Sequence, residues 1–166
     1  MIGFCDESAF TSKPNNKRVL NTKVVKHKTD NRKITVFGAM LLNGRDVAML
    51  SERSKSEDFI RFLGAVRIEN PEKPILFILD NARIHHAKIV KPVCSELDVW
   101  LVYLPPYSPD LNPIEFVWKD GKKNLAMHGF EEIEEMAKKT VESIMKEGKH
   151  SYARNWTASF IVPRGS

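Results

Sequence analysis

Apolar and polar positions alternate through the first half of the chain in a way that predicts strands. Apolar side chains dominate Ile2–Ser8, Ile34–Leu42 and Asp46–Leu50, and Asn43-Gly44 between the last two is a typical hairpin turn. The polar stretch Thr11–Arg32 shows no comparable period and predicts a long loop. The chain should therefore open with three antiparallel strands.

The second half of the chain alternates helix and strand patterns. Ser54 and Glu57 have the spacing of a capping box, which predicts that a helix begins there. The apolar runs Ile75–Leu79 and Val99–Leu104 suit strands that are buried on both faces, and a helix is predicted between them at Ala87–Leu97. Together these segments predict a parallel sheet with crossover helices.

Two prolines and a glycine affect where the predicted helices begin, bend or end. Pro92 should kink the helix in which it lies or divide it in two. A further helix should follow Asn112-Pro113, an N-cap residue and a first-turn proline, and run to about Met127, although Asp120-Gly121 lies in its middle and should end or bend it. The last predicted helix is Glu131–Lys146.

These elements predict one α/β domain, a mixed five-stranded sheet with helices on both faces. The predicted order is β-β-β-α-β-α-β-α-α. Residues 1–160 should form the domain, and Ile161–Ser166 ends like the remnant of a protease cleavage site. The fractions of hydrophobic residues (42%) and charged residues (28%) are those of an ordinary globular protein, and no apolar run is long enough to span a bilayer.

The number of cysteines and the distribution of charge indicate the redox compartment and the kind of molecule that the protein could bind. Cys5 and Cys94 are too few for a disulfide framework, so a reducing cytoplasm is expected. The stretch from residue 11 to residue 33 carries eight basic residues and one acid. Its net charge is therefore larger than the net charge of +5 of the whole chain. The basic residues are Lys13, Lys17, Arg18, Lys23, Lys26, Lys28, Arg32 and Lys33. This patch suits either a polyanion such as nucleic acid or a solvated loop.

Three acidic residues stand where predicted strands or loops end. Asp6 lies within the first strand, Asp80 follows a buried strand, and Glu115 opens a helix. Functional groups of α/β sheets gather at the carboxyl ends of strands, and a buried carboxylate needs a positive partner, for which a divalent cation is suitable. The alternatives are a helix-capping role for Glu115 and a turn role for Asp80, and either Asp6 or Glu7 could face the site, since neighbours in a strand point to opposite faces.

Two long motifs strengthen the catalytic interpretation. Residues 79–85 read Leu-Asp-Asn-Ala-Arg-Ile-His, and residues 104–115 read Leu-Pro-Pro-Tyr-Ser-Pro-Asp-Leu-Asn-Pro-Ile-Glu. With 34 residues between Asp80 and Glu115, and with Asp6-Glu7-Ser8 near the start, the chain closely resembles the mariner-superfamily DDE transposases, especially their insertion-sequence branch. The resemblance extends from Phe4 to about Lys123.

The resemblance implies an RNase H-like fold and a two-metal active site. Asp6, rather than Glu7, would bind two Mg²⁺ or Mn²⁺ ions together with Asp80 and Glu115. In this family such ions promote attack by water or by a DNA 3′-hydroxyl on a phosphodiester. The implied partners are double-stranded DNA, as transposon ends and as target, and a second copy of the chain in a homodimer. The implied location is the cytoplasm of a prokaryote, at the nucleoid.

Other residues near the motifs have structural roles, functional roles or both as open alternatives. His85 would lie near the scissile phosphate or pack at a helix start, and Asn81 would hold the Asp80 loop. Trp118 should pack in the core. The helix after Glu115 also carries three lysines that would either follow a phosphate backbone or remain solvated, namely Lys119, Lys122 and Lys123.

The chain also departs from the family. Family members usually carry an N-terminal helix-turn-helix region, and only a few residues precede Asp6 here, so end recognition is expected on a separate polypeptide. Two alternative functions therefore remain beside the transposase. One is an inactive remnant that binds DNA or inhibits an intact transposase, and the other is a different RNase H-like nuclease.

Overall fold

The computed structural model describes residues 1–11, 33–128, 135 and 137–139. In chain order the regular elements are β1 (Ile2–Thr11), β2 (Lys33–Leu41), β3 (Val47–Ser51), α1 (Ser56–Glu69), β4 (Ile75–Leu79), α2 (Val90–Glu96), β5 (Val99–Tyr103) and α3 (Ile114–His128). Two short 3-10 turns, Arg83–His86 and Pro109–Leu111, precede α2 and α3. Up to α3 the order of elements agrees with the prediction.

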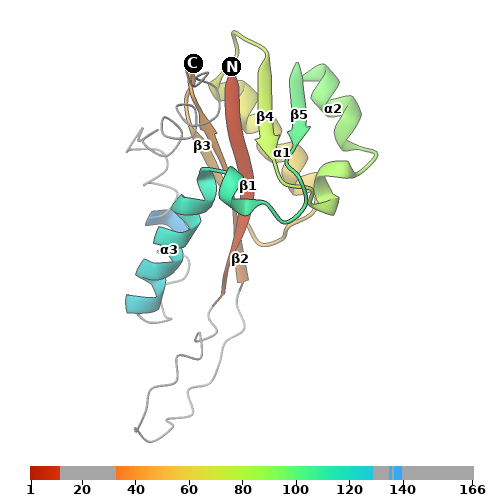
Figure 1. Ribbon diagram of the computed structural model, residues 1–166. Helices are drawn as coiled ribbons and strands as arrows, with labels where there is room; N and C mark the ends of the chain where they lie inside the picture. The colour runs from red at the N-terminus through yellow and green to blue at the C-terminus, as the bar shows by residue number, and fades with distance from the viewer. Residues whose placement is uncertain (12–32, 129–134, 136, 140–166) are drawn as a thin grey trace, which may run out of the picture.

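The five strands form one mixed sheet in the order β3-β2-β1-β4-β5 (Figure 1). β1 pairs antiparallel with β2, and β2 pairs antiparallel with β3. On the other side, β1 pairs parallel with β4, and β4 pairs parallel with β5. The predicted mixed sheet is therefore confirmed, with the antiparallel unit on one side of β1 and the parallel unit on the other.

Helices cover both faces of the sheet, as predicted, and each face has its own core. α1 and α2 pack on one face over residues such as Cys5, Phe37 and Phe77, and α3 packs on the other over Phe4 and Val36. Alternate side chains of β1 therefore enter different cores. Burying an apolar side chain of this size stabilises the fold by about 1.5–3 kcal/mol, so β1, fully sandwiched, is well fixed.

The hairpin between β2 and β3 differs from the prediction. The strand pairing stops at Ala39 and Val47, so the connection is longer than a two-residue Asn-Gly turn. The Asp46 carboxylate accepts a hydrogen bond from the backbone N–H of Leu41 at 2.9 Å and satisfies the end of β2. Gly44 allows close packing, since a Cβ there would lie 2.6 Å from the Asn70 side-chain oxygen. Tertiary packing thus determines this turn.

The start of α1 was also predicted incorrectly. The helix begins at Ser56, so the acid in the third helical position is Asp58 and not Glu57. Asp58 accepts a hydrogen bond from the backbone N–H of Lys55 at 3.2 Å and forms an ion pair with Arg61. The capping interaction predicted for Ser54 and Glu57 is made one position later, by Asp58, because this almost fully buried residue contacts both Lys55 and Arg61.

The other helices correct the remaining predictions. The segment predicted as Ala87–Leu97 contains a shorter helix, α2, and Pro92 lies in its first turn, where the missing N–H costs no hydrogen bond and causes no break. α3 ends at His128, which confirms the helix predicted to about Met127, and Asp120-Gly121 does not end it early. Most of the predicted Glu131–Lys146 helix lies outside the described residues, as does the loop 12–32. No helix in the described part is long and apolar enough to cross a membrane.

Candidate active site

The register of β1 and β4 brings two of the predicted acids to the same end of the sheet. The last paired residues of these parallel strands are Phe4 and Ile78, so Asp6 and Asp80 each follow two residues later. β5 runs parallel to β4 and ends at the same level, where Leu79 pairs with Tyr103. Beyond these positions β1 no longer pairs with β4, and Asp6 and Asp80 follow directly after the end of that pairing.

Glu115 reaches the same region from the proline-rich loop. The loop ends in a 3-10 turn, and the first turn of α3 forms as the backbone N–H of Glu115 donates to the Asn112 carbonyl at 3.1 Å. The buried Asn112 side chain donates to the Cys5 carbonyl at 3.1 Å, which ties the loop to β1 beside Asp6. Asp80 and Glu115 line one cavity of about 440 Å³ together with the loop prolines.

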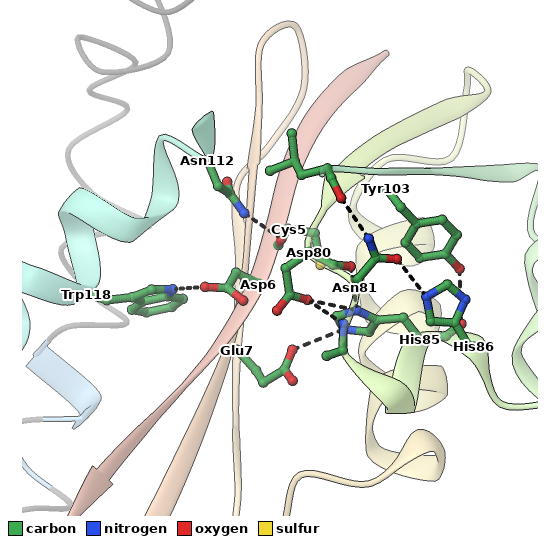
Figure 2. A network of polar contacts seen from close by, with 12 residues as sticks. Cys5, Asp6, Glu7, Asp80, Asn81, His85, His86, Tyr103, Asn112 and Trp118 are labelled. Atoms are coloured by element: carbon green, nitrogen blue, oxygen red, sulfur yellow. Dashed lines mark hydrogen bonds and ion pairs between the residues drawn. The ribbon is translucent and has the colours of Figure 1, made fainter. Parts of the chain in front are cut away.

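Asp6 is a buried carboxylate with a single side-chain donor. It points toward α3 and accepts a hydrogen bond from the indole N–H of Trp118 at 2.9 Å (Figure 2). Burial, followed by the negative charges of Glu7, Glu115 and Asp80, raises the pKa of Asp6 to about 8. Without a cation, Asp6 therefore keeps its proton at neutral pH, and a bound cation would favour its charged form.

Asp80 is half-exposed and is held through one carboxylate oxygen. Its Oδ1 accepts from the backbone N–H of Ala82 at 3.0 Å and lies 3.2 Å from His85 Nδ1. The hydrogen bond with His85, ahead of that with Ala82, lowers the pKa of Asp80 despite partial burial. The bond from Ala82 makes an Asx turn, which explains why Asp80 resembles a turn aspartate in the sequence. Among the described residues, no hydrogen bond occupies its other carboxylate oxygen, Oδ2.

His85 is fully buried between two carboxylates. Its Nε2 lies 3.1 Å from Glu7 Oε2, its Nδ1 faces Asp80, and its ring packs on Phe59 with the ring centroids 4.5 Å apart. Burial opposes the charged ring, but hydrogen bonds with Asp80 and Glu7 outweigh it and raise the pKa of His85 to about 9. The packing interpretation of His85 is confirmed by its burial against Phe59, whereas its place near a scissile phosphate stays a prediction.

Glu7 is a site residue that the sequence interpretation set aside. Asp6 and Glu7 point to opposite faces of β1, as strand geometry requires, but each face meets part of the site. Asp6 meets Trp118 on the α3 side, and Glu7 meets His85 on the other side (Figure 2). The acidic pair Asp6-Glu7 was the available signal, and the partner of Glu7 could only be identified in the fold.

Asn81 connects the Asp80 loop to the start of the proline-rich loop. Its amide group donates to the Leu104 carbonyl at 2.8 Å, and its oxygen lies 3.0 Å from His86 Nε2. The His86 ring stacks on Tyr103, with centroids 4.2 Å apart, and the Tyr103 hydroxyl donates to the His85 carbonyl at 3.2 Å (Figure 2). Asn81 thus fixes the loop that follows Asp80 against the loop that carries Glu115.

The donor set suits an open, hydrated cation site rather than a closed one. In the described part of the chain, no three acidic, histidine or cysteine side chains converge closely enough to enclose a metal. Mg²⁺ usually keeps several waters and takes only one or two carboxylates directly, so carboxylates with space between them are compatible with it. Burial, followed by repulsion from Glu7, Glu115 and Asp80, raises the pKa of Asp6, and a cation would offset both effects.

The predicted DNA-contacting lysines divide into two groups. Residues 13–32 lie outside the described part, and Lys33 is exposed at the start of β2. Lys119, Lys122 and Lys123 are exposed on α3. Lys119 lies 3.7 Å from the Asp110 carboxylate and over the Phe116 ring, so part of its charge is already paired.

The fold resembles that of solved transposases. The chain superposes on a "Mos1 transposase paired-end complex with left transposon end" with a TM-score of 0.67 and 18% identity, covering 93% of this chain and 53% of that one. For the "mariner Mos1 paired end complex with Mg" the TM-score is 0.67 and the identity 17%, over 96% and 54% of the two chains. For the "catalytic domain of Mos1 mariner transposase" they are 0.65 and 19%, over 93% and 78%.

These likenesses confirm the RNase H-like fold. The chain spans about half the length of the transposases in the two paired-end complexes. No curated protein matched the sequence. The sequence profile described as "DDE superfamily endonuclease" matches residues 1–137. Since that profile includes the β1, β4 and proline-loop motifs and covers most of the chain, this protein belongs to the DDE superfamily of endonucleases.

Proposed function

We propose that this chain is the catalytic part of a DDE transposase, which cuts and joins DNA phosphodiesters with divalent ions held by Asp6, Asp80 and Glu115. The observation that carries the proposal is the gathering of these acids at one end of the sheet, with the pKa of Asp6 raised to about 8 by burial and by its acidic neighbours. A group of mutually repelling carboxylates is costly to the fold, and it has a chemical use if cations occupy it.

Each carboxylate has a defined task in this proposal. Asp80 keeps one oxygen in its Asx turn and offers the other to a cation, and Asp6 does the same with one oxygen held by Trp118. Glu115, on the first turn of α3, would complete the set across the cavity that it shares with Asp80. When bound, Mg²⁺ or Mn²⁺ would supply activation of the attacking hydroxyl and stabilisation of the departing oxygen. The Mos1 complex solved with Mg supports this choice of metal.

Double-stranded DNA is the proposed substrate. The complex of Mos1 with a left transposon end supports DNA ends as the ligand, and the paired-end arrangement supports a homodimer. The exposed Lys122 and Lys123 lie on the helix that carries Glu115, and the basic stretch 13–33 would add further phosphate contacts. Each phosphate contact makes binding more sensitive to salt.

The decisive experiment is a nicking and strand-transfer assay with Mn²⁺ on duplex DNA that carries the flanking ends of the element. Asp80→Asn and Glu115→Gln should each abolish cutting and joining. Asp98→Asn is the matched control, because Asp98 is exposed at the opposite end of β5 and its left-handed backbone suits asparagine. Control activity should equal that of the unmodified protein.

The products of that assay distinguish the competing functions. Metal-dependent joining supports a transposase. Binding of DNA without any cleavage would overturn the proposal in favour of an inactive remnant. Cleavage of RNA–DNA hybrids or branched junctions, with no joining, would overturn it in favour of another RNase H-like nuclease. Unchanged cutting by Asp80→Asn would exclude the carboxylate assignment itself.

A further inference from the structure

Glu7 and His85 connect the strand that carries Asp6 to the loop that carries Asp80. Glu7 Oε2 lies 3.1 Å from one ring nitrogen of His85, and Asp80 Oδ1 lies 3.2 Å from the other. Figure 2 shows the imidazole of His85 in contact with both carboxylates, Glu7 on β1 and Asp80 at the end of β4. The contact between Glu7 and His85 joins residues 78 positions apart in the chain.

We propose that Glu7 is a positioning residue for the metal site, because it fixes the His85 ring and thereby the orientation of the Asp80 carboxylate. This inference rests on the proposed function, since it assigns Asp80 to a metal. Neither Glu7 nor His85 would contact the cation or the DNA in this role. His85 acts through Oδ1 of Asp80, which its Nδ1 faces at 3.2 Å, and Glu7 acts through His85.

The surroundings of His85 explain why such a bridge can orient its neighbours. The ring is almost fully buried, and it packs against Phe59 at a centroid distance of 4.5 Å, which limits rotation out of its plane. The Asp80 carbonyl lies 3.3 Å from the same nitrogen that faces Oδ1, so the ring also holds the backbone at Asp80. The partners of the two ring nitrogens restrain the remaining movement of the imidazole, and Glu7 is the partner of Nε2.

The low exposure of Glu7 indicates that its carboxylate serves the contact with His85 and is not a solvated surface group. The Glu7 side chain is only 15% exposed, and it lies on the face of β1 opposite to Asp6. A glutamate at that depth is costly unless it is paired, and the imidazole of His85 provides that partner. Metal-ligand carboxylates are commonly oriented by such neighbours, and loss of one typically costs about tenfold to a hundredfold in metal affinity.

The first test measures the Kd for Mn²⁺ from the electron paramagnetic resonance signal of the free ion, with no DNA and no turnover. Glu7→Leu keeps the bulk of the side chain but cannot hydrogen-bond, and it should raise Kd by about tenfold to a hundredfold. Glu7→Gln keeps a hydrogen-bonding group opposite Nε2 and should stay within about threefold of the unmodified protein. Equal weakening by both variants, or no weakening by Glu7→Leu, would overturn the proposal.

The second test is a double-mutant cycle between Glu7 and His85. His85→Asn places an amide near the position of Nδ1, where it can still donate to Asp80, but it does not reach Glu7. If Glu7 acts through the imidazole, Glu7→Leu should change the Kd of the His85→Asn protein by less than about twofold. The same factor in both backgrounds would mean that Glu7 acts independently of His85 and would overturn the inference.

A third variant separates this inference from the proposed function. Asp80→Asn should abolish tight Mn²⁺ binding if Asp80 is a ligand. Loss of binding in Asp80→Asn together with an unaffected Glu7→Leu protein would overturn only the positioning role. Retained binding in Asp80→Asn would overturn the metal assignment from which the inference starts. Melting temperatures of all variants identify any general loss of folding, and the comparison of Glu7→Gln with Glu7→Leu remains valid when both melt alike.

Discussion

The indole N–H of Trp118 donates to the Asp6 carboxylate at 2.9 Å and so joins α3 to the central strand of the sheet. Trp118 lies in the core as predicted, with 1% of its surface exposed. It follows Glu115 by three residues and shares a face of α3 with it. The same helix turn therefore holds one proposed ligand and fixes another, which couples the positions of Asp6 and Glu115.

We predict that Trp118→Phe destabilises the protein by about 1–3 kcal/mol, because the ring packing is partly kept while a buried acceptor loses its donor. Urea denaturation measures the change. Trp100→Phe is the matched control, since Trp100 is 66% exposed on β5, and it should change the free energy of unfolding by less than about 0.5 kcal/mol. Similar losses in both variants would contradict a specific role for the Asp6 contact.

Gly38 permits the close approach of α3 to the sheet. It pairs with Asp6 in the strand register, and a Cβ there would lie 2.8 Å from the Trp118 ring and 2.9 Å from Ile114. We predict that Gly38→Ala costs about 1–3 kcal/mol of stability and weakens Mn²⁺ binding, because α3 must shift away from Asp6.

The control for this change is Gly64→Ala. Gly64 lies within α1 and a Cβ there would have no neighbour within 4 Å, so alanine should stabilise the helix by up to about 1 kcal/mol. Thermal melts of both variants, together with Mn²⁺ titrations, measure the contrast. If Gly38→Ala were as stable as the unmodified protein, the close packing of α3 would not control the site.

The sequence predicted the sheet and the order of elements because the patterns of the strands are strong. The runs Ile75–Leu79 and Val99–Leu104 are apolar at every position, which favours strands in both places. The predicted burial on both faces suits β4 but is wrong for β5, because β5 is the edge strand and one of its faces exposes Trp100 (66%) and Val102 (46%). The starts of α1 and α2 were misplaced because they depend on tertiary partners. Asp58 caps α1 in the company of Arg61, and a 3-10 turn that buries His85 shortens α2.

The carboxylate positions were predictable from motifs, but their supporting contacts were not. Asp80 and Glu115 stand at recognisable points, the end of a strand and the start of a helix. The contacts of Glu7 with His85 and of Trp118 with Asp6 join residues far apart in the chain, and no local spacing reports them. A single sequence fixes which face a residue takes in a strand, whereas the element facing it is decided by topology.

Asn81 should matter more for catalysis than for stability. Its amide bonds to the Leu104 carbonyl at an exposed position, where water can replace the lost contact. We predict that Asn81→Ala lowers the rate of Mn²⁺-dependent nicking by about tenfold to a hundredfold through misplacement of Asp80 relative to Glu115, with less than about 1 kcal/mol lost in stability. Ser108→Ala is the control, since its hydroxyl donates to the Pro106 carbonyl within the same proline-rich loop. Equal rates for the two variants would show that the tie to Leu104 is dispensable.

The metal-free protein should lose stability as the pH rises from about 6 to 9. The pKa of Asp6 is raised to about 8 in the fold, against about 3.9 in an unfolded chain, so folding takes up a proton between these values. That contribution is complete below about pH 4 and is lost as the pH rises through about 8. The pKa of His85 is raised to about 9, so its contribution is lost in the same direction, above about pH 6.5. The lowered pKa of Asp80 acts oppositely, but only at acidic pH.

Melting temperatures between pH 6 and pH 9, with and without Mn²⁺, test this expectation. Asp6→Asn cannot ionise, so its melting temperature should fall less steeply with pH in the absence of metal. Mn²⁺ at pH 8 should raise the melting temperature of the unmodified protein, because binding to the folded state alone stabilises it, and should have little effect on Asp6→Asn. A metal-free melting temperature that rises over this range would contradict the raised pKa values of Asp6 and His85. A Mn²⁺ response that persists in Asp6→Asn would instead remove Asp6 from the ligand set.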